Sequence, residues 1–378
     1  MEGAGLPIDA PTSDDLRGAF RVYGTRIDGD QLLYFGEVIG PLEDLEQEVW
    51  PTFRAAGYEV QIAHVDRQRQ RPTCVLVAEP VSLGIQGIPW TNVFLLLATV
   101  ASTLYVGSMW YYIDLTGDLL SIVEAWPFAA AVILVLGFHE LGHYALSRYH
   151  GVQASLPYFL PVPTIFGTMG AVIKIRGRIP DRRALFDIGV AGPIAGLIAT
   201  VVVIIIGLHL PPVTAPEGLA DSESTVELAI GFPPLLEFIA WMVGEPLRFD
   251  DARMSVNPVV IGGWLGLFIT FLNLIPVGQL DGGHITRAML GPVQARIGLV
   301  IPIALFALGG ILYLLIETPL HAVSVWLIWG VFATLLAAVG PAEPVDDRPL
   351  DRRRQLLGIL TLGIGVLCFV PVPIEIIG

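Results

Sequence analysis

The stretch FAAAVILVLGFHELGHYAL, residues 128–146, places three ionisable side chains within five positions of an otherwise apolar segment. Charged or titratable groups at membrane depth cost roughly 2.5–3.5 kcal/mol each on insertion scales, so they generally serve a function. Positions i and i+4 of a helix lie on one face, so His139 and His143 can share one metal ion. Glu140 lies about 100° further round the helix, within reach of a water on that metal. The stretch therefore indicates a metal-dependent hydrolase site inside a membrane.

The composition of the whole chain is that of a membrane protein. Hydrophobic residues make up 54% of the 378 residues, charged residues 15%, and the mean hydropathy is +0.68. The two cysteines, Cys74 and Cys368, provide neither a disulfide framework nor a cysteine zinc site. The net charge of −14 argues against nucleic acid as a partner. Lys174 is the one lysine, which is typical of a salt-adapted prokaryote or, alternatively, of a GC-rich genome that favours arginine.

The first part of the chain, residues 1–85, reads as a small water-soluble α+β domain that we expect in the cytoplasm. Apolar residues recur at helical spacing from Leu42 to Phe53, and Pro51 is expected to kink or end that helix. Strands are predicted on both sides of it, which gives a ββαββ unit. Their centres are residues 20–24, 32–35, 60–63 and 74–77.

Residues 86–378 read as a transmembrane domain, because long apolar runs alternate with short polar links. A spanning helix needs about 20 apolar residues. Pro371 and Pro373 shorten the last candidate, so we expect a polytopic α-helical membrane protein with about six to seven transmembrane helices. The candidates are residues 90–113, 126–149, 184–208, 256–279, 296–316, 321–340 and 356–374.

Positive charge predicts the orientation of these spans. With the N-terminus in the cytoplasm, all of the 21 basic residues except Arg248 and Arg253 lie in cytoplasmic regions. The opposite orientation would export nearly all of them. We therefore expect an integral protein of the cell membrane with its N-terminus inside, and with the HELGH segment toward the cytoplasmic end of the second span.

Two segments do not fit simple spans. Residues 154–180 contain three prolines, which forbid a regular helix, followed by a strand-like stretch between glycines. We expect a re-entrant β-hairpin beside the HELGH helix, where protein or a water-filled cavity covers its backbone. Residues 209–255 read as an acidic external loop.

A catalytic zinc usually has three protein ligands and one open position, so the two histidines need a partner. His209 and His321 fall at the external end of the predicted topology, and His284 reads as a neighbour of the site rather than a ligand. The fourth span runs inward and brings Asp281 to the cytoplasmic side, level with His139 and His143. A carboxylate oxygen suits zinc as a third ligand.

These two motifs together resemble a known family. HELGH in one span, with Asn-(x)2-Pro-(x)4-Asp-Gly-Gly over residues 273–283, is similar to the site-2 protease family of intramembrane zinc metalloproteases. Residues 166–170 and 191–196 also match, and the resemblance covers roughly residues 90–295. It is closest to the branch without a PDZ domain, which includes plastid proteases tied to gravitropism, and residues 209–255 are too few for a PDZ insertion. Gly196 departs from the family pattern, since many relatives carry Asn there.

The resemblance implies a role for each matched residue. His139, His143 and Asp281 would bind one Zn2+ per chain, and Glu140 would serve as the general base. Strand addition of an unwound substrate to the hairpin would satisfy its backbone, which has no water partner in lipid. The substrate-binding candidates are Asn273, Pro276, Gly167, Thr168 and Gly170.

Three functions remain open at this point. The first is a zinc-dependent endopeptidase that cleaves single-span membrane proteins near the cytoplasmic side, in regulated intramembrane proteolysis. The second is a proteolytically silent membrane chaperone or adaptor, which the intact His139, Glu140, His143 and Asp281 argue against. The third is an ion transporter, which predicts internal repeats and charges in several spans, and the sequence shows neither. The physiological substrate, the need for a prior cleavage and the oligomeric state are not encoded in any motif.

Overall fold

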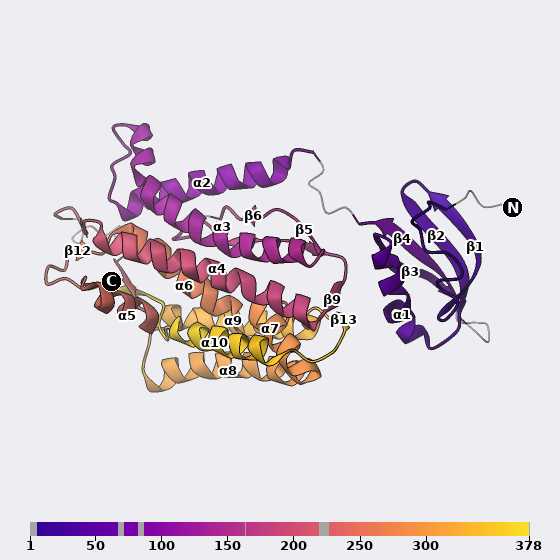
Figure 1. Cartoon of the computed structure of the whole chain (residues 1–378). Helices are drawn as coiled ribbons and strands as arrows, with labels where there is room; N and C mark the ends of the chain where they lie inside the picture. The colour runs from indigo at the N-terminus through magenta and orange to yellow at the C-terminus, as the bar shows by residue number, and fades with distance from the viewer. Residues whose placement is uncertain (1–5, 67–71, 82–86, 163, 219–226, 378) are drawn as a thin grey trace. The chain divides into compact units, whose positions relative to one another are not determined.

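The structure is a computed structural model that describes residues 6–66, 72–81, 87–162, 164–218 and 227–377 (Figure 1). The chain divides into two compact units. The smaller contains residues 1–84 together with 151–153 and 176–178, and the larger contains the remaining residues. Each unit has its own core and is described separately.

The smaller unit is an antiparallel four-stranded sheet with one helix, as the predicted ββαββ unit requires. The strands β1 (Phe20–Asp28), β2 (Gln31–Val38), β3 (Tyr58–Asp66) and β4 (Thr73–Pro80) form the order β1-β2-β4-β3. Helix α1 (Leu42–Ala55) buries Phe53 against Tyr34, with ring centroids 5.1 Å apart. The expectation that Pro51 would end this helix is wrong, because α1 continues to Ala55. Burial of its apolar face outweighs the hydrogen bond that proline cannot donate.

In the residues that the structure describes, the larger unit contains five helices that are long and apolar enough to cross a membrane. They are α2 (Trp90–Trp110), η1 with α3 (Leu119–Ala125 and Trp126–Tyr149), α4 (Arg182–His209), α7 through α8 (Asp281–Leu290, η2 Gly291–Val293, Gln294–Leu315) and α9 (Leu320–Val339). The polytopic α-helical membrane fold predicted from the sequence is thus confirmed.

The other two predicted spans are shorter than expected. Helix α6 (Pro258–Asn273) has 16 residues, which corresponds to a length of about 24 Å. Most of its side chains are buried among α3, α4 and α10, so the helices around it provide an apolar environment along its length. Helix α10 (Arg352–Leu367) also has 16 residues and begins with three arginines. It ends before Pro371, as the proline pair predicted.

The predicted hairpin is present between α3 and α4. Strand β6 (Tyr158–Phe159) pairs with β7 (Ala171–Val172), and β5 (Gln153–Ala154) pairs with β8 (Ile175–Arg176). Side chains of α2 bond to its backbone: Asn92 Nδ2 donates to the Leu156 carbonyl at 2.9 Å, and Trp110 Nε1 donates to the Ile165 carbonyl at 3.0 Å. These bonds satisfy carbonyl groups that have no water partner at membrane depth.

Short paired strands lie at each of the two ends of the helical bundle. Beyond the C-terminal end of α4, β10 (Val213–Thr214) pairs with β12 (Met254–Ser255). Strand β11 (Glu227–Ile230), which precedes α5 (Pro234–Val243), pairs with β14 (Ile374–Ile377). At the N-terminal end of α4, β13 (Pro344–Asp346) pairs in parallel with β9 (Ile179–Asp181). Helix α10 therefore connects one end of α4 to the other.

Candidate metal centre

Helix α3 brings His139 and His143 to one buried face. The side chains are four residues apart, and their Nε2 atoms lie 3.2 Å from each other. His139 is 4% exposed and His143 is 7% exposed. Two imidazoles this close, with their ring nitrogens converging, are arranged to share a ligand.

A tight turn between α6 and α7 brings Asp281 to the same point. Asp281 is the first residue of α7, and its carboxylate oxygens lie 3.2 Å from His139 Nε2 and 3.2 Å from His143 Nε2. The turn needs glycine at two positions, because a side chain there would collide with the backbone. A Cβ on Gly282 would lie 2.1 Å from the Leu274 carbonyl oxygen, and a Cβ on Gly283 would lie 2.2 Å from the Gly278 carbonyl oxygen. The Asp-Gly-Gly sequence thus lets the chain fold back closely enough to place the carboxylate.

The three side chains fit a zinc ion. Two ligands bonded at about 2.0 Å to a tetrahedral zinc lie roughly 3.3 Å apart, close to the 3.2 Å separations of these donor atoms. Asp281 Oδ2 is buried and has no hydrogen-bond partner within the described part of the chain, as expected of a carboxylate that a cation would satisfy. Among the described residues, His139, His143 and Asp281 are the one group of histidine, cysteine or acidic side chains with this convergence.

Helix α4 orients His143 and leaves room for it. His143 Nδ1 donates to the Ile188 carbonyl oxygen at 2.8 Å, which leaves Nε2 available as a metal ligand. A Cβ on Gly192 would lie 2.0 Å from His143 Nε2, and one on Gly196 would lie 3.0 Å from His139 Nδ1. The glycines of the 191–196 motif therefore provide space for the two histidines, beyond allowing close packing of the helices.

Glu140, the predicted general base, lies next to this cluster on α3. Its side chain is buried, with 6% exposure, and its carboxylate accepts a hydrogen bond from the Ile173 backbone N–H on the hairpin. This hydrogen bond from the hairpin restrains the orientation of Glu140, and no sequence motif predicted it.

The substrate-binding candidates occupy different positions. Asn273 is the last residue of α6, and its Nδ2 lies 3.1 Å from His139 Nε2, so it lies at the metal centre. The Pro276 carbonyl accepts a 3.4 Å hydrogen bond from Gln294 Nε2, on the first residue of α8. Gly167, Thr168 and Gly170 shape the hairpin: both glycines have positive φ, and Thr168 Oγ1 donates to the Leu160 carbonyl at 2.9 Å. Their contact with substrate stays a prediction.

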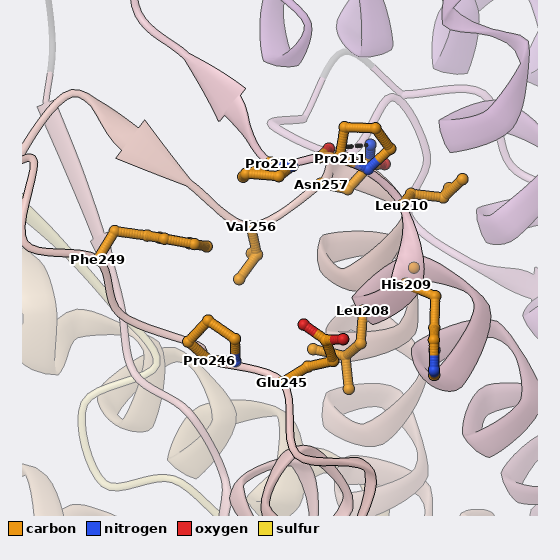
Figure 2. Close-up of a pocket in the computed structure, with 11 residues that line it drawn as sticks. Leu208, His209, Leu210, Pro211, Pro212, Glu245, Pro246, Phe249, Val256 and Asn257 are labelled. Atoms are coloured by element: carbon orange, nitrogen blue, oxygen red, sulfur yellow. Dashed lines mark hydrogen bonds between the residues drawn. The ribbon is translucent and has the colours of Figure 1, made fainter.

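A cavity of about 240 Å³ lies at the other end of α4 (Figure 2). It is lined by Leu208, His209, Glu245, Phe249 and Asn257, among others, and Asn257 is fixed by its bond to the Pro211 carbonyl. His209 lies 21 residues beyond Ile188 on one helix, which is about 31 Å along its axis. His209 is therefore remote from the metal centre, as its predicted position implied.

The fold and the HExxH geometry define a metal centre built within membrane-length helices. Residues 127–316 match the model of the family described as Peptidase family M50. The chain belongs to this family, and the resemblance to site-2 proteases is confirmed.

Named relatives support this assignment. The chain is 32% identical to "Probable zinc metalloprotease EGY2, chloroplastic" of Arabidopsis thaliana, over 70% of this chain and 46% of that protein. It is 32% identical to "Probable zinc metalloprotease EGY1, chloroplastic" of the same plant, over 66% and 43%. It is 24% identical to "Probable zinc metallopeptidase EGY3, chloroplastic", over 90% and 61%. The chain thus spans about half the length of the first two relatives. No solved structure matches it significantly.

Proposed function

We propose that this protein is a zinc-dependent endopeptidase that hydrolyses peptide bonds of membrane-spanning substrates within the bilayer. The observation that carries the proposal is the convergence of His139, His143 and Asp281 beside Glu140, inside helices long enough to span a membrane. We expect one zinc ion per chain. The names of the zinc metalloprotease relatives support the reaction class.

The residues of the site provide the parts of a peptide hydrolysis. A zinc ion held by His139, His143 and Asp281 would supply Lewis-acid activation of water and of the scissile carbonyl. The Glu140 carboxylate takes a proton from the attacking water and passes it to the leaving amine nitrogen. The Ile173 N–H holds that carboxylate in place before the reaction. Asn273 Nδ2 lies close enough to the donor atoms to hydrogen-bond a substrate oxygen there.

The hairpin provides a backbone for the substrate to pair with. Peptide bonds in a helix are shielded, so a membrane-spanning substrate must unwind locally before hydrolysis. Val172 pairs with Tyr158 and Ala171 with Phe159, and the Leu160 N–H donates to the Gly170 carbonyl oxygen. The hydrogen-bonded positions therefore alternate through Gly170 and Val172, so the backbone groups of Ala171 and Ile173 point away from β6. An unwound substrate lying along this edge would have its own N–H and C=O groups satisfied beside Glu140.

The proposal extends to the location of the reaction. Positive charge supports an N-terminus in the cytoplasm and cleavage near the cytoplasmic face of a cell membrane. The acidic, lysine-poor composition supports a salt-adapted prokaryotic source. The partners we propose are single-span membrane proteins and the lipid bilayer, with no role for nucleic acid.

Cleavage of a model single-span substrate by the purified protein in detergent tests this proposal. Glu140→Gln should abolish cleavage while zinc stays bound, because the amide keeps the shape of the carboxylate and cannot take the proton. Glu124→Gln is the matched control, since Glu124 is exposed and should leave cleavage unchanged. Cleavage that survives Glu140→Gln would contradict the proposal. Zinc binding without cleavage of any substrate would favour the silent chaperone instead.

A further inference from the structure

Residues 340–351, which connect α9 to α10, lie outside the part of the chain that matches the family model. This 340–351 segment crosses the end of the bundle at which α4 begins. Its strand β13 pairs in parallel with β9, with Pro344 opposite Ile179 and Asp346 opposite Asp181. The segment thereby comes to lie against the turn that carries Asp281.

The first residues of the 340–351 segment bond directly to that turn. Gln279 Nε2 donates to the Gly340 carbonyl oxygen. The Ala342 backbone N–H donates to His284 Nδ1 at 3.3 Å, and His284 also bonds to the Gln279 backbone. His284 thus links the 340–351 segment to both sides of Asp281, which explains its place beside the site without making it a ligand.

Two buried guanidinium groups attach the rest of the segment. Arg182 of α4 is 8% exposed and binds the Asp347 carboxylate through two hydrogen bonds of 2.7 Å. Arg287 of α7 is 6% exposed and donates to Asp347 at 2.8 Å and to Glu343 at 3.1 Å. Buried charges are tolerated only with hydrogen-bonded partners, and Asp347 is the partner that the two arginines share, with Glu343 as a second partner of Arg287.

Helix α7 needs such support because it is short and is bounded by turns. It has 10 residues, and Gly278 and Gly291 on either side of it have positive φ. Asp281 is its first residue, and Arg287 lies six positions later on the same rigid helix. A displacement of Arg287 therefore moves Asp281 relative to His139 and His143, which are on α3.

We propose that the 340–351 segment positions Asp281 for metal binding, with Asp347 as the positioning residue that acts through Arg287. This inference rests on the proposed function of Asp281 as a zinc ligand. Substitution of residues that orient metal ligands without binding the metal themselves typically lowers metal affinity by about 10–100-fold. Asp347→Asn, which keeps the shape and removes the charge, should weaken zinc binding to that extent.

Zinc affinity of the purified full-length protein, measured by competition with a chromophoric chelator, tests the proposal without requiring proteolysis. The matched control is Asp346→Asn, because Asp346 is a neighbour whose ion pair with Arg348 is exposed. Asp347→Glu should restore part of the affinity, since it returns the charge. Wild-type affinity in Asp347→Asn would overturn the proposal, even if the thermal midpoint of the metal-free form falls.

A milder variant covers the case in which Asp347→Asn fails to fold. Gln279→Ala removes the contact with Gly340 at an exposed position and should weaken zinc binding several-fold, with little change in metal-free stability. Unchanged affinity in this variant would also count against the proposal. A wild-type protein that binds no zinc would instead refute the proposed function itself, so the two failures are distinguishable.

Discussion

Substitution of Gly192 by alanine tests whether the space beside His143 is essential for the metal centre. The new Cβ would lie 2.0 Å from Nε2, 2.4 Å from Cδ2 and 2.5 Å from Cε1 of the His143 ring. Ordinary contacts between such atoms are about 3.5 Å, so the ring must move by roughly 1.5 Å. Metal–ligand distances vary by only about 0.2 Å. The bond from Nδ1 to the Ile188 carbonyl also restrains the ring, so His143 is expected to leave the ligand set.

The expected loss of zinc affinity in Gly192→Ala is at least about 100-fold, which corresponds to about 2.8 kcal/mol. Overpacking should also lower the stability of the metal-free protein by about 1–3 kcal/mol. Both quantities are measured on one sample, by chelator competition and by thermal unfolding with excess chelator.

Gly310→Ala is the control for this substitution. Gly310 lies inside α8, and apart from its own helix backbone no heavy atom of the described residues lies within 4 Å of its Cβ position, so alanine should leave zinc binding unchanged. Alanine in place of a helical glycine stabilises by about 0.5–1 kcal/mol, so stability should be equal or slightly higher. Wild-type zinc affinity in Gly192→Ala would refute the reasoning.

Three other predictions concern stability. The hydrogen bonds from Arg182 and Arg287 lower the pKa of Asp347 from 3.8 to about 2, so this group stabilises the fold above about pH 4 and the contribution is lost as pH falls toward 2. The difference in thermal midpoint between wild type and Asp347→Asn should therefore shrink from about pH 5 to pH 2, and an unchanged difference would contradict the assignment. Gly278→Ala should lower the free energy of unfolding by more than about 2 kcal/mol, because its φ is +49° and the new Cβ would meet the Leu336 carbonyl oxygen at 2.2 Å. Gly244→Ala is the matched control: Gly244 is left-handed at φ +79° with open space at its Cβ position, so alanine should cost only about 1–2 kcal/mol in chemical denaturation. Removal of zinc should lower the thermal midpoint of the wild type. The free energy of unfolding should fall by about 2.7 kcal/mol relative to a sample with free zinc at 100 times Kd. An equal effect of zinc on the stability of Asp281→Ala would contradict the ligand set.

The sequence identified the parts of the site that depend on local rules. Helical periodicity alone places His139 and His143 on one face, and the direction of successive spans brings Asp281 to their level. The structure brings all three within hydrogen-bond distance of one another. Prolines and glycines in residues 154–180 likewise predicted a hairpin in place of a helix.

The sequence did not reveal the contacts that depend on packing between distant segments. The space beside His143 depends on how closely α3 and α4 approach, and a glycine at position 192 would suit ordinary helix packing equally well. The bond from Ile173 to Glu140 is made by a backbone group, which leaves no trace in side-chain patterns. In the sequence, nothing distinguishes Asp347 from the other acidic residues. Only the fold shows that it accepts hydrogen bonds from both Arg182 and Arg287. The short α6 also needed the tertiary structure, because length rules assume that a helix faces lipid.

X-ray absorption at the zinc edge of the purified protein is the most direct test of the metal centre, because it reports the atoms bound to the metal. We expect one zinc per chain with two imidazole nitrogens at about 2.0–2.1 Å, oxygen in the remaining positions and no sulfur. His143→Ala should remove one imidazole from the spectrum. Sulfur at about 2.3 Å, or an unchanged spectrum in His143→Ala, would contradict the metal centre described here.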